Sequence, residues 1–352
     1  MTVAPIAVAS WGRRRGGNQA LLTRHAIGVP LCVGILLVIG LLSLRCGSLE
    51  LSATTAWNAL VDYDSTDQGQ IVVRQLRVPR TLVGAAAGAC LAVAGAITQG
   101  VTRNPLGSPG LLGVNAGAAF AVVTAIFALN VVSPLGYVWF AFLGALGASV
   151  VVYAVASTGP GGPTPVKLAL AGAIITALLA AWTTSLLLLD SETLDQARFW
   201  LAGSIAGRGL EELRLLFPMM AIALVAGLFM GRQINALSLG EDVAAGLGQR
   251  TTYVRVASAA IVVVLAGSAV AIAGPVAFVG LAIPHVVRSL VGPDYRWILL
   301  YCVILGPCLL LGADIVGRIV VRPAELQVGI VTAAVGAPFL VYLVRFTKLA
   351  EL

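Results

Sequence analysis

The chain has 352 residues, of which 59% are hydrophobic and only 11% are charged, and its mean hydropathy is +0.97. A soluble domain of this length needs a charged surface that this composition cannot supply, so an ordinary soluble protein is excluded. The 22 Lys and Arg outnumber the 15 Asp and Glu, which gives a formal net charge of +7.

Apolar runs of about 20 residues recur along the chain and are continuous rather than alternating. Such runs predict α-helices that cross a bilayer core of roughly 30 Å. We therefore expect an all-α polytopic membrane protein with one transmembrane domain, residues 26–346, and ten transmembrane helices. The predicted spans lie at about 26–44, 80–101, 109–130, 136–157, 166–189, 212–231, 252–272, 275–291, 297–318 and 327–346.

Residues 1–25 form a basic arm that contains Arg13–Arg15. The apolar run behind it is long enough to span, and no clear small-residue cleavage site precedes Arg45, so we expect a retained helix rather than a signal peptide. Lys and Arg are modestly more frequent in the loops on the side of this arm, which predicts a cytoplasmic N-terminus. With an even number of spans, the tail 347–352 is then cytoplasmic as well.

Two segments on the opposite side are long, residues 45–79 and 190–211, and we expect short helices there that cap the outer mouth. Small residues recur at helical spacing in the second span, and also in the third. Close packing of helices in lipid uses this pattern. The glycines concerned are Gly84, Gly88, Gly95, Gly113 and Gly117.

The loop between the second and third spans holds two prolines and two glycines in the seven residues Asn104-Pro-Leu-Gly-Ser-Pro-Gly110. It cannot continue a helix, so we expect a tight turn. Asn104, Pro105 and Leu106 are candidate gate residues at the inner end of a pathway, although a purely structural turn is the alternative.

A second loop, between the sixth and seventh spans, carries Leu237, Leu239, Val243 and Leu247 at near-helical spacing. The spacing predicts a short amphipathic helix over 237–248 on the cytoplasmic face, stopped by Gly248. It is either a handle for a soluble partner or an interfacial helix without one.

In the eighth span, Pro275 suits the first turn and Pro284 lies near the cytoplasmic end, next to His285 and Arg288. His285 is more typical of a hydrogen-bonded structural residue than of a ligand or proton relay. The five cysteines are scattered without C-x-x-C spacing, so we predict neither a disulfide framework nor a metal site. The P-loop motif of an ATPase does not occur in the sequence.

These runs together resemble the FecCD family of ABC importer permeases, which move iron-siderophores, haem and cobalamin. The resemblance extends from about Gln75 to Leu343. It rests on Leu76-Arg-Val-Pro-Arg-Thr-Leu82, Gln99, Asn104-Pro-Leu106, Pro109-Gly-Leu-Leu-Gly113, Trp200, Gly203-Ser204, Leu239-Gly240, Ala245, Leu247-Gly248, Phe278-Val-Gly-Leu281, Pro284-His285, Arg288, Glu325-Leu326, Gly329 and Gly336-Ala-Pro-Phe339.

The resemblance implies the type II ABC importer permease fold, in the inner (cytoplasmic) membrane, with the pathway between two permease subunits. The second subunit is a copy of this chain or a paralogue, and we favour a paralogue. No cofactor is expected in this chain, because Mg-ATP is held by a separate ATPase subunit. The residues expected to dock into that ATPase are Leu237, Leu239, Gly240, Glu241, Ala245, Leu247 and Gly248.

The resemblance also implies that Arg77, Arg80 and Arg318 pair with carboxylates of a periplasmic-type substrate-binding protein. A guanidinium is a natural bidentate partner of a carboxylate. The alternative is that these arginines are interfacial anchors, or pair with Asp314 and Glu325 of the same chain. Transport would proceed by alternating access, driven by the ATPase. A ferric siderophore is the expected cargo, with cobalamin and haem as alternatives.

An ion-coupled secondary transporter is a hypothesis from another class. It needs ionisable residues inside the membrane, and the spans offer only Asp314, beside Arg318, and His285. An acid next to an arginine is more typical of a salt bridge. A membrane enzyme is disfavoured, because we find no paired acids, no H-E-x-x-H motif and no nucleophile–base arrangement at a membrane boundary.

Overall fold

The computed structural model describes residues 13–47, 51–159 and 164–346, and within these ranges the chain is helical without a β-strand. Most of the predicted basic arm, and the tail 347–352, lie outside the described residues or are described by backbone alone. The helices are α1 (Arg13–Arg45), α2 (Ala53–Val61), α3 (Gln68–Val72), α4 (Val78–Thr102), α5 (Val114–Leu129), α6 (Pro134–Ala156), α7 (Pro165–Leu189), α8 (Ser191–Leu201), α9 (Leu210–Phe229), α10 (Gly231–Ser238), α11 (Glu241–Gly246), α12 (Thr251–Ala273), α13 (Val279–Val291), α14 (Tyr295–Val320) and α15 (Val328–Phe346), with a π-helical turn η1 (Val73–Arg77) and a 3-10 turn η2 (Pro109–Leu112).

Seven of the described helices are long and apolar enough to cross a membrane, which confirms the prediction of a polytopic α-helical protein. They are α1, the continuous run α3–η1–α4, α6, α7, α9, α12 and α14. Three shorter apolar helices, α5, α13 and α15, accompany them. Each of the ten predicted spans overlaps one of these helices, and the count of ten crossings stays a prediction.

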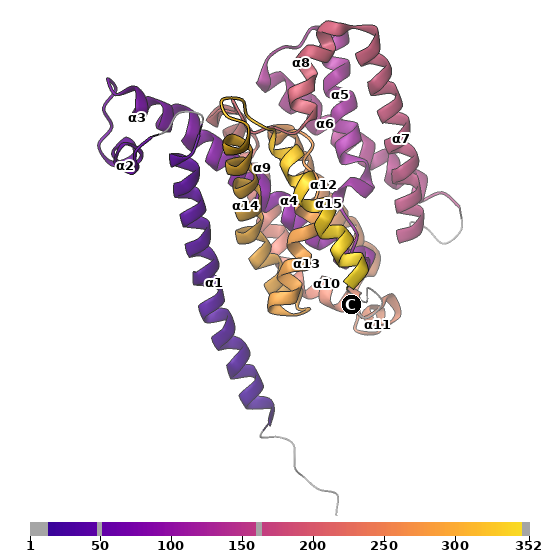
Figure 1. The fold of residues 1–352 in the computed structure, drawn as a ribbon. Helices are drawn as coiled ribbons and strands as arrows, with labels where there is room; N and C mark the ends of the chain where they lie inside the picture. The colour runs from indigo at the N-terminus through magenta and orange to yellow at the C-terminus, as the bar shows by residue number, and fades with distance from the viewer. Residues whose placement is uncertain (1–12, 48–50, 160–163, 347–352) are drawn as a thin grey trace, which may run out of the picture.

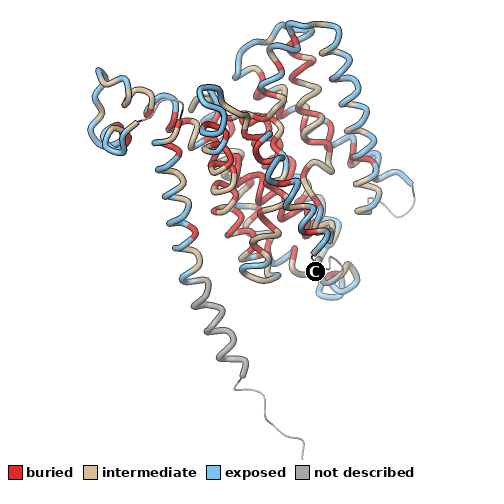
Figure 2. Tube along the Cα trace, in the orientation of Figure 1, coloured by how far each residue is buried: buried red, intermediate tan, exposed pale blue. Residues whose placement is uncertain are grey.

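Helix α4 lies at the centre of the bundle, packed along α14, α12 and α13 (Figures 1 and 2). Its buried face is made of small residues, which let neighbouring backbones come close. A Cβ added to Gly88 would lie 2.6 Å from the carbonyl oxygen of Gly306 in α14, and one added to Gly95 would lie 1.8 Å from that of Gly280 in α13. The predicted close packing is therefore confirmed for these glycines.

Gly113 has a different role from the one we predicted. Its φ of +73° is left-handed, and it separates η2 from α5. The predicted span 109–130 is thus broken at this glycine, because only glycine adopts this conformation without strain. The predicted span 275–291 begins late for a similar reason: Gly274 and Phe278 have positive φ, and α13 starts at Val279.

The second predicted span, 80–101, extends farther toward the N-terminus than expected. Pro79 lacks an N–H and cannot complete a regular helical turn. The chain stays helical through the π-helical turn η1, in which the N–H of Val78 donates to the carbonyl of Val73. The helix is therefore continuous from Gln68 to Thr102, 35 residues in all.

Short helices cluster at the two ends of the bundle. Helices α2, α3 and α8 lie at one end, which we call the α8 end, and α10 and α11 lie at the other, the α11 end, next to the C-terminal end of α15 (Figure 1). The short helices predicted within 45–79 and 190–211 are confirmed as α2, α3 and α8. Polar loops at both ends of an apolar bundle are where a membrane protein meets water.

Candidate functional site

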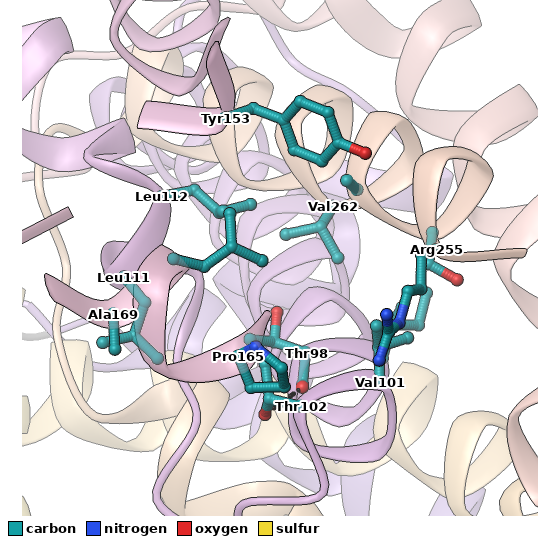
Figure 3. A pocket seen from close by; sticks show the side chains of 14 residues that line it. Thr98, Val101, Thr102, Leu111, Leu112, Tyr153, Pro165, Ala169, Arg255 and Val262 are labelled. Atoms are coloured by element: carbon teal, nitrogen blue, oxygen red, sulfur yellow. Dashed lines mark hydrogen bonds between the residues drawn. The ribbon is translucent and has the colours of Figure 1, made fainter. Parts of the chain in front are cut away.

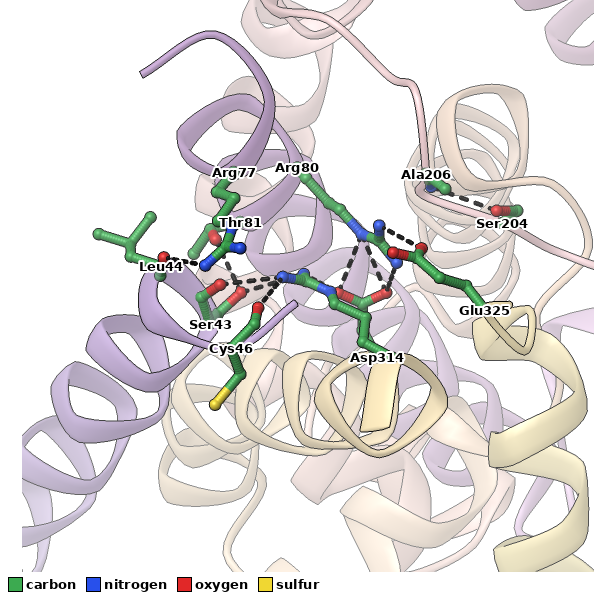
Figure 4. A network of polar contacts seen from close by, with 11 residues as sticks. Ser43, Leu44, Cys46, Arg77, Arg80, Thr81, Ser204, Ala206, Asp314 and Glu325 are labelled. Atoms are coloured by element: carbon green, nitrogen blue, oxygen red, sulfur yellow. Dashed lines mark hydrogen bonds and ion pairs between the residues drawn. The ribbon is translucent and has the colours of Figure 1, made fainter. Parts of the chain in front are cut away.

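The three arginines singled out from the sequence line one cavity at the α8 end, and Figure 4 shows Arg77 and Arg80 there. Arg80 forms ion pairs with two carboxylates: its Nη2 lies 2.6 Å from Oδ1 of Asp314, and its Nη1 lies 2.7 Å from Oε2 of Glu325. Asp314 also forms an ion pair with Arg318, one turn farther along α14. Arg80 thus joins α4, α14 and the loop before α15 through charge-assisted hydrogen bonds.

Arg77 and Arg318 turn inward and bind the end of α1. Arg318 Nη1 donates to the carbonyl oxygens of Ser43 at 2.9 Å and of Cys46 at 3.0 Å, and Arg77 Nη1 donates to that of Leu44 at 2.9 Å. The last carbonyls of a helix have no partner within the helix, so the two guanidinium groups cap α1.

The three arginines differ in how deeply they are buried. Arg77 and Arg318 are 5% and 1% exposed, whereas the Arg80 side chain is 12% exposed. These placements agree with the interpretation that the arginines have partners within the chain. Contact with another protein stays a prediction, and of the three arginines Arg80 lies nearest the surface.

Two cavities open beside this network. One, of about 370 Å³, is lined by Arg77, Arg80, Arg318 and Arg208, and the other, of about 300 Å³, by Arg80, Arg208 and Trp200 among others. Arg208, which sequence reasoning missed, lines both. Burial lowers the pKa of its guanidinium, and Glu212 acts in the opposite direction. The feature of the sequence that marks Arg208 is its position as a single arginine in the glycine-rich loop between α8 and α9.

At the α11 end, the predicted single helix over 237–248 is wrong. Gly240, with a φ of +115°, breaks the segment into α10 and α11. Leu237 belongs to α10 and is fully buried, while Leu239 and Leu247 are 66% and 69% exposed. The predicted stop is confirmed, because Gly248 follows α11 with a φ of +81°.

Glu241, the first residue of α11, ties this helix to the bundle. Its carboxylate forms an ion pair with Arg255 of α12, and Nη2 of Arg103 lies 3.9 Å from its Oε1. Arg103 ends α4 in a left-handed conformation. A displacement of α11 would therefore be transmitted to α12 and to the end of α4.

The loop that holds Asn104, Pro105 and Leu106 follows directly. Asn104 Oδ1 accepts the N–H of Leu106 at 2.9 Å, which closes the tight turn that we predicted. A cavity of about 290 Å³ lies beyond this loop, lined by Ser108, Asn115 and Phe278 among others.

Gln99 is buried at 2% exposure, and its side-chain amide links α4 to two residues of α13, Leu281 and Arg288. Its Nε2 donates to the carbonyl of Leu281 at 3.2 Å, and its Oε1 accepts from Nη2 of Arg288 at 3.2 Å.

Pro284 is buried inside α13, and His285 packs edge-on against Phe339 with 6.1 Å between ring centroids. The Nδ1 of His285 has no hydrogen-bond partner in the described chain, so the hydrogen-bonded role we expected is not seen at that atom.

A smaller cavity of about 60 Å³ lies between α4, η2, α6, α7 and α12 (Figure 3). Its wall is mostly apolar, and the hydroxyls of Thr98 and Thr102 are used within α4 by the carbonyls of Ala94 and Thr98. The hydroxyl of Ser258, which also lines the cavity, has no hydrogen-bond partner among the described residues.

The chain was compared with known proteins. The sequence model of the FecCD transport family matches residues 35–346. The chain is 45% identical over 316 residues to the probable siderophore transport system permease protein YfiZ of Bacillus subtilis, a match that covers 88% of this chain and 95% of that protein. It is 44% identical over 330 residues to the ferric enterobactin transport system permease protein FepD of Escherichia coli, covering 93% and 98%.

The fold is also similar to a solved structure. A transporter of the metal-chelate ABC type, in an inward-facing conformation, superposes with a TM-score of 0.79 and 31% sequence identity. The match covers 90% of this chain and 97% of that one. The similarity therefore includes both ends of the bundle.

Proposed function

Because the chain belongs to the FecCD transport family, we propose that it is the membrane-spanning permease subunit of an ATP-driven ABC importer of ferric siderophores. The observation that carries this proposal is the match of the family model to residues 35–346, since this range covers the bundle and the polar loops at both of its ends. The protein performs no covalent chemistry in this account. Mg-ATP is bound and hydrolysed by a separate subunit, since the sequence has no P-loop motif.

The topology follows from the two ends of the bundle. We place the α11 end in the cytoplasm together with both chain termini, and the α8 end outside the inner membrane. The gathering of α10, α11 and the end of α15 at one side supports this orientation (Figure 1). All ten apolar helices, the seven long and the three shorter ones, are then membrane crossings.

The ATPase subunit docks on α11 and its flanks. Leu239, Val243 and Leu247 are exposed at 66%, 49% and 69%, which suits a protein interface better than open water. The surface that the ATPase contacts also includes Gly240, Glu241, Ala245 and Gly248. The ion pair of Glu241 then carries the movement of the ATPase into α12.

The substrate-binding protein docks at the α8 end, over the network that contains Arg80. Arg80 contacts the incoming carboxylates, while Arg77 and Arg318 fix the end of α1 and add positive charge beneath it. A second permease, a copy or a paralogue, completes the pathway. The apolar helix faces left for it to cover are those of α1 and α7, whose apolar windows are each only 11% buried in the single chain.

The cargo passes between the two permeases by alternating access, with Asn104–Leu106 at the inner gate. Cobalamin and haem stay as alternative cargoes within the same family. The ion-coupled alternative has little support in the geometry, because Asp314 is paired with both Arg80 and Arg318.

Purification of the tagged chain from mildly solubilised native membranes tests this function. Mass spectrometry is expected to identify a P-loop ATPase, a substrate-binding protein and a bound iron chelate. Repeated recovery of the chain alone would contradict the proposal. A corrinoid or haem in place of a siderophore would correct the cargo only.

A further inference from the structure

Helix α2 leaves an apolar side uncovered in the part of the chain that the structure describes. Three apolar side chains one helical turn apart, Trp57, Leu60 and Val61, are 61%, 49% and 67% exposed. A single exposed apolar residue is ordinary, but three at the spacing i, i+3 and i+4 form a patch on one side of the helix. Such a patch marks a contact with lipid or with another protein.

The other two sides of α2 have different surroundings. Ala56 and Ala59 are buried against Val73 of η1, which fixes one side of the helix to the chain. Thr54 and Asn58 are exposed and polar, and the sequence of the helix contains no charged residue. The helix therefore has a side toward the protein, a polar side and an apolar side, as a helix does that lies along a membrane surface.

The position of α2 favours lipid as the partner of its apolar side. Helix α1 is long and apolar enough to cross a membrane, and α2 lies beside the C-terminal end of α1, in contact with α1 and η1 (Figure 1). In the last turns of α1, Val38, Leu41 and Leu42 are exposed as well. Helix α2 therefore lies next to apolar surface at the level where α1 leaves the bilayer, and tryptophan is enriched at this level of membrane proteins.

A second permease has a better surface on the opposite side of the bundle, where α7 lies (Figure 1). The turn η2, which follows the predicted gate loop, packs closely on α7: a Cβ added to Gly172 would lie 1.8 Å from the carbonyl oxygen of Leu111. A partner that shares the inner gate therefore covers α7, and lipid is left for α1 and α2. This choice of side rests on the proposed function.

We propose that α2 is an interfacial helix that binds the phospholipid surface of the outer leaflet through Trp57, Leu60 and Val61. The contact also anchors η1, because the buried side of α2 packs on Val73, four residues before Arg77. The anchor holds the arginines at the α8 end at a constant depth relative to the membrane surface.

Quenching of tryptophan fluorescence by brominated phosphatidylcholine tests the lipid contact. The full chain is placed in nanodiscs whose lipids carry bromine either near the headgroup or near the end of the acyl chains. The contribution of Trp57 is the difference between the wild type and Trp57→Phe. We expect bromine near the headgroup to quench this contribution at least about twofold more than bromine near the chain end, because an interfacial helix lies at the headgroup boundary.

A matched variant moves the indole to the polar side of the same helix. Trp57→Phe combined with Asn58→Trp shifts the indole by one position, about 100° around the helix axis. This indole is expected to be quenched weakly by both lipids. Equal quenching at positions 57 and 58, or no quenching of Trp57 by either lipid, would overturn the proposal.

The same measurement identifies a protein partner if there is one. Quenching of Trp57 is repeated with the second permease and the binding protein that co-purify with the chain. Unchanged quenching supports lipid, whereas loss of quenching on addition of either protein assigns the apolar side of α2 to that protein and overturns the proposal. Failure of the proposed function is distinct, because Trp57 would then still be quenched while ATP-dependent siderophore uptake is absent.

Hydrogen exchange of the η1 amides in nanodiscs tests the anchoring role. Trp57→Ser combined with Leu60→Ser is expected to speed this exchange about threefold or more, because η1 loses the support of an anchored α2. Asn58→Ser, on the polar side, is the control and should leave the exchange rates unchanged. Equal rates in the two variants would contradict the anchoring of η1.

Discussion

Arg318 is a buried cation that binds backbone carbonyls as well as a carboxylate. It caps carbonyls at the end of α1 and pairs with Asp314 at the same time. At 1% exposure its charge is removed from water, so every one of these partners matters for stability.

Replacement of Arg318 by Ala is expected to destabilise the protein by about 3 kcal/mol, because Asp314 loses one of its two arginines and α1 loses one of its two capping guanidinium groups. Denaturant unfolding in detergent measures the change. Arg198→Ala breaks an exposed ion pair with Asp195 and should cost less than about 1 kcal/mol. Equal effects of the two substitutions would contradict the structural role given to Arg318.

Asp294, just before α14, predicts a pH dependence. Hydrogen bonds from Arg296 first, and then from Asn235, lower the pKa of this carboxyl from 3.8 to about 2. A lowered pKa gives stability that is fully present above about pH 4 and is lost as the pH falls toward 2. The group is partly solvated, so we expect about 1 kcal/mol.

The free energies of unfolding of the wild type and of Asp294→Asn, compared between pH 7 and pH 3, test this prediction. The wild type should be the more stable at pH 7, and the difference should shrink in the acid range. A difference that stays constant down to pH 3 would show that the charge of Asp294 is not its source.

For single residues, the sequence indicated which side chains are important better than it indicated which groups they contact. The resemblance implied one shared role, contact with a binding protein, for Arg77, Arg80 and Arg318, and Asp314 and Glu325 were foreseen as possible partners. The capping of α1 was not foreseen, because the contacts join residues more than 30 positions apart and use backbone carbonyls, which have no sequence signature. Arg208 was missed because a single loop arginine is not distinctive until folding buries it.

Among the elements, the packing of α4 against α13 depends on glycine. Gly95→Ala would place a Cβ 1.8 Å from the carbonyl oxygen of Gly280, so the two helices must move apart. We expect a loss of about 3 kcal/mol, measured by thermal unfolding in detergent. Gly147→Ala in α6 is the control, because its Cβ meets nothing within 4 Å, and it should gain about 0.5–1 kcal/mol. A neutral Gly95→Ala would refute this close contact.

The ion pair of Glu241 with Arg255 predicts a coupling defect. Glu241→Gln should reduce siderophore uptake about fivefold or more while ATP hydrolysis continues, because α11 no longer pulls directly on α12. Uptake and hydrolysis are measured together on the assembled transporter. Asp242→Asn, the adjacent acid, should leave both rates unchanged. A parallel fall of uptake and hydrolysis in Glu241→Gln would instead indicate lost docking of the ATPase.

Element boundaries were less predictable than element types. Hydropathy placed the long helices because continuous apolar runs have no other stable form in lipid. It could not place the breaks at Gly113, Gly240 and Gly274, since a glycine in a membrane helix serves packing as readily as a left-handed turn. The amphipathic spacing over 237–248 was interpreted as one helix for the same reason.

At the scale of the whole molecule, composition alone determined the class of protein, and the family match determined the kind of transport. The two polar ends that transport needs are present: a cluster of arginines at the α8 end and an exposed apolar handle at the α11 end. Their pairing with partner proteins was inferred from the resemblance, because a single chain holds only half of each interface.

ATP-driven import is tested by uptake of iron-labelled siderophore into proteoliposomes that contain this chain with its ATPase and second permease, with the binding protein and chelate outside. We expect uptake that requires enclosed Mg-ATP and the binding protein and that persists when the proton gradient is dissipated. Uptake that follows the proton gradient without ATP would contradict it.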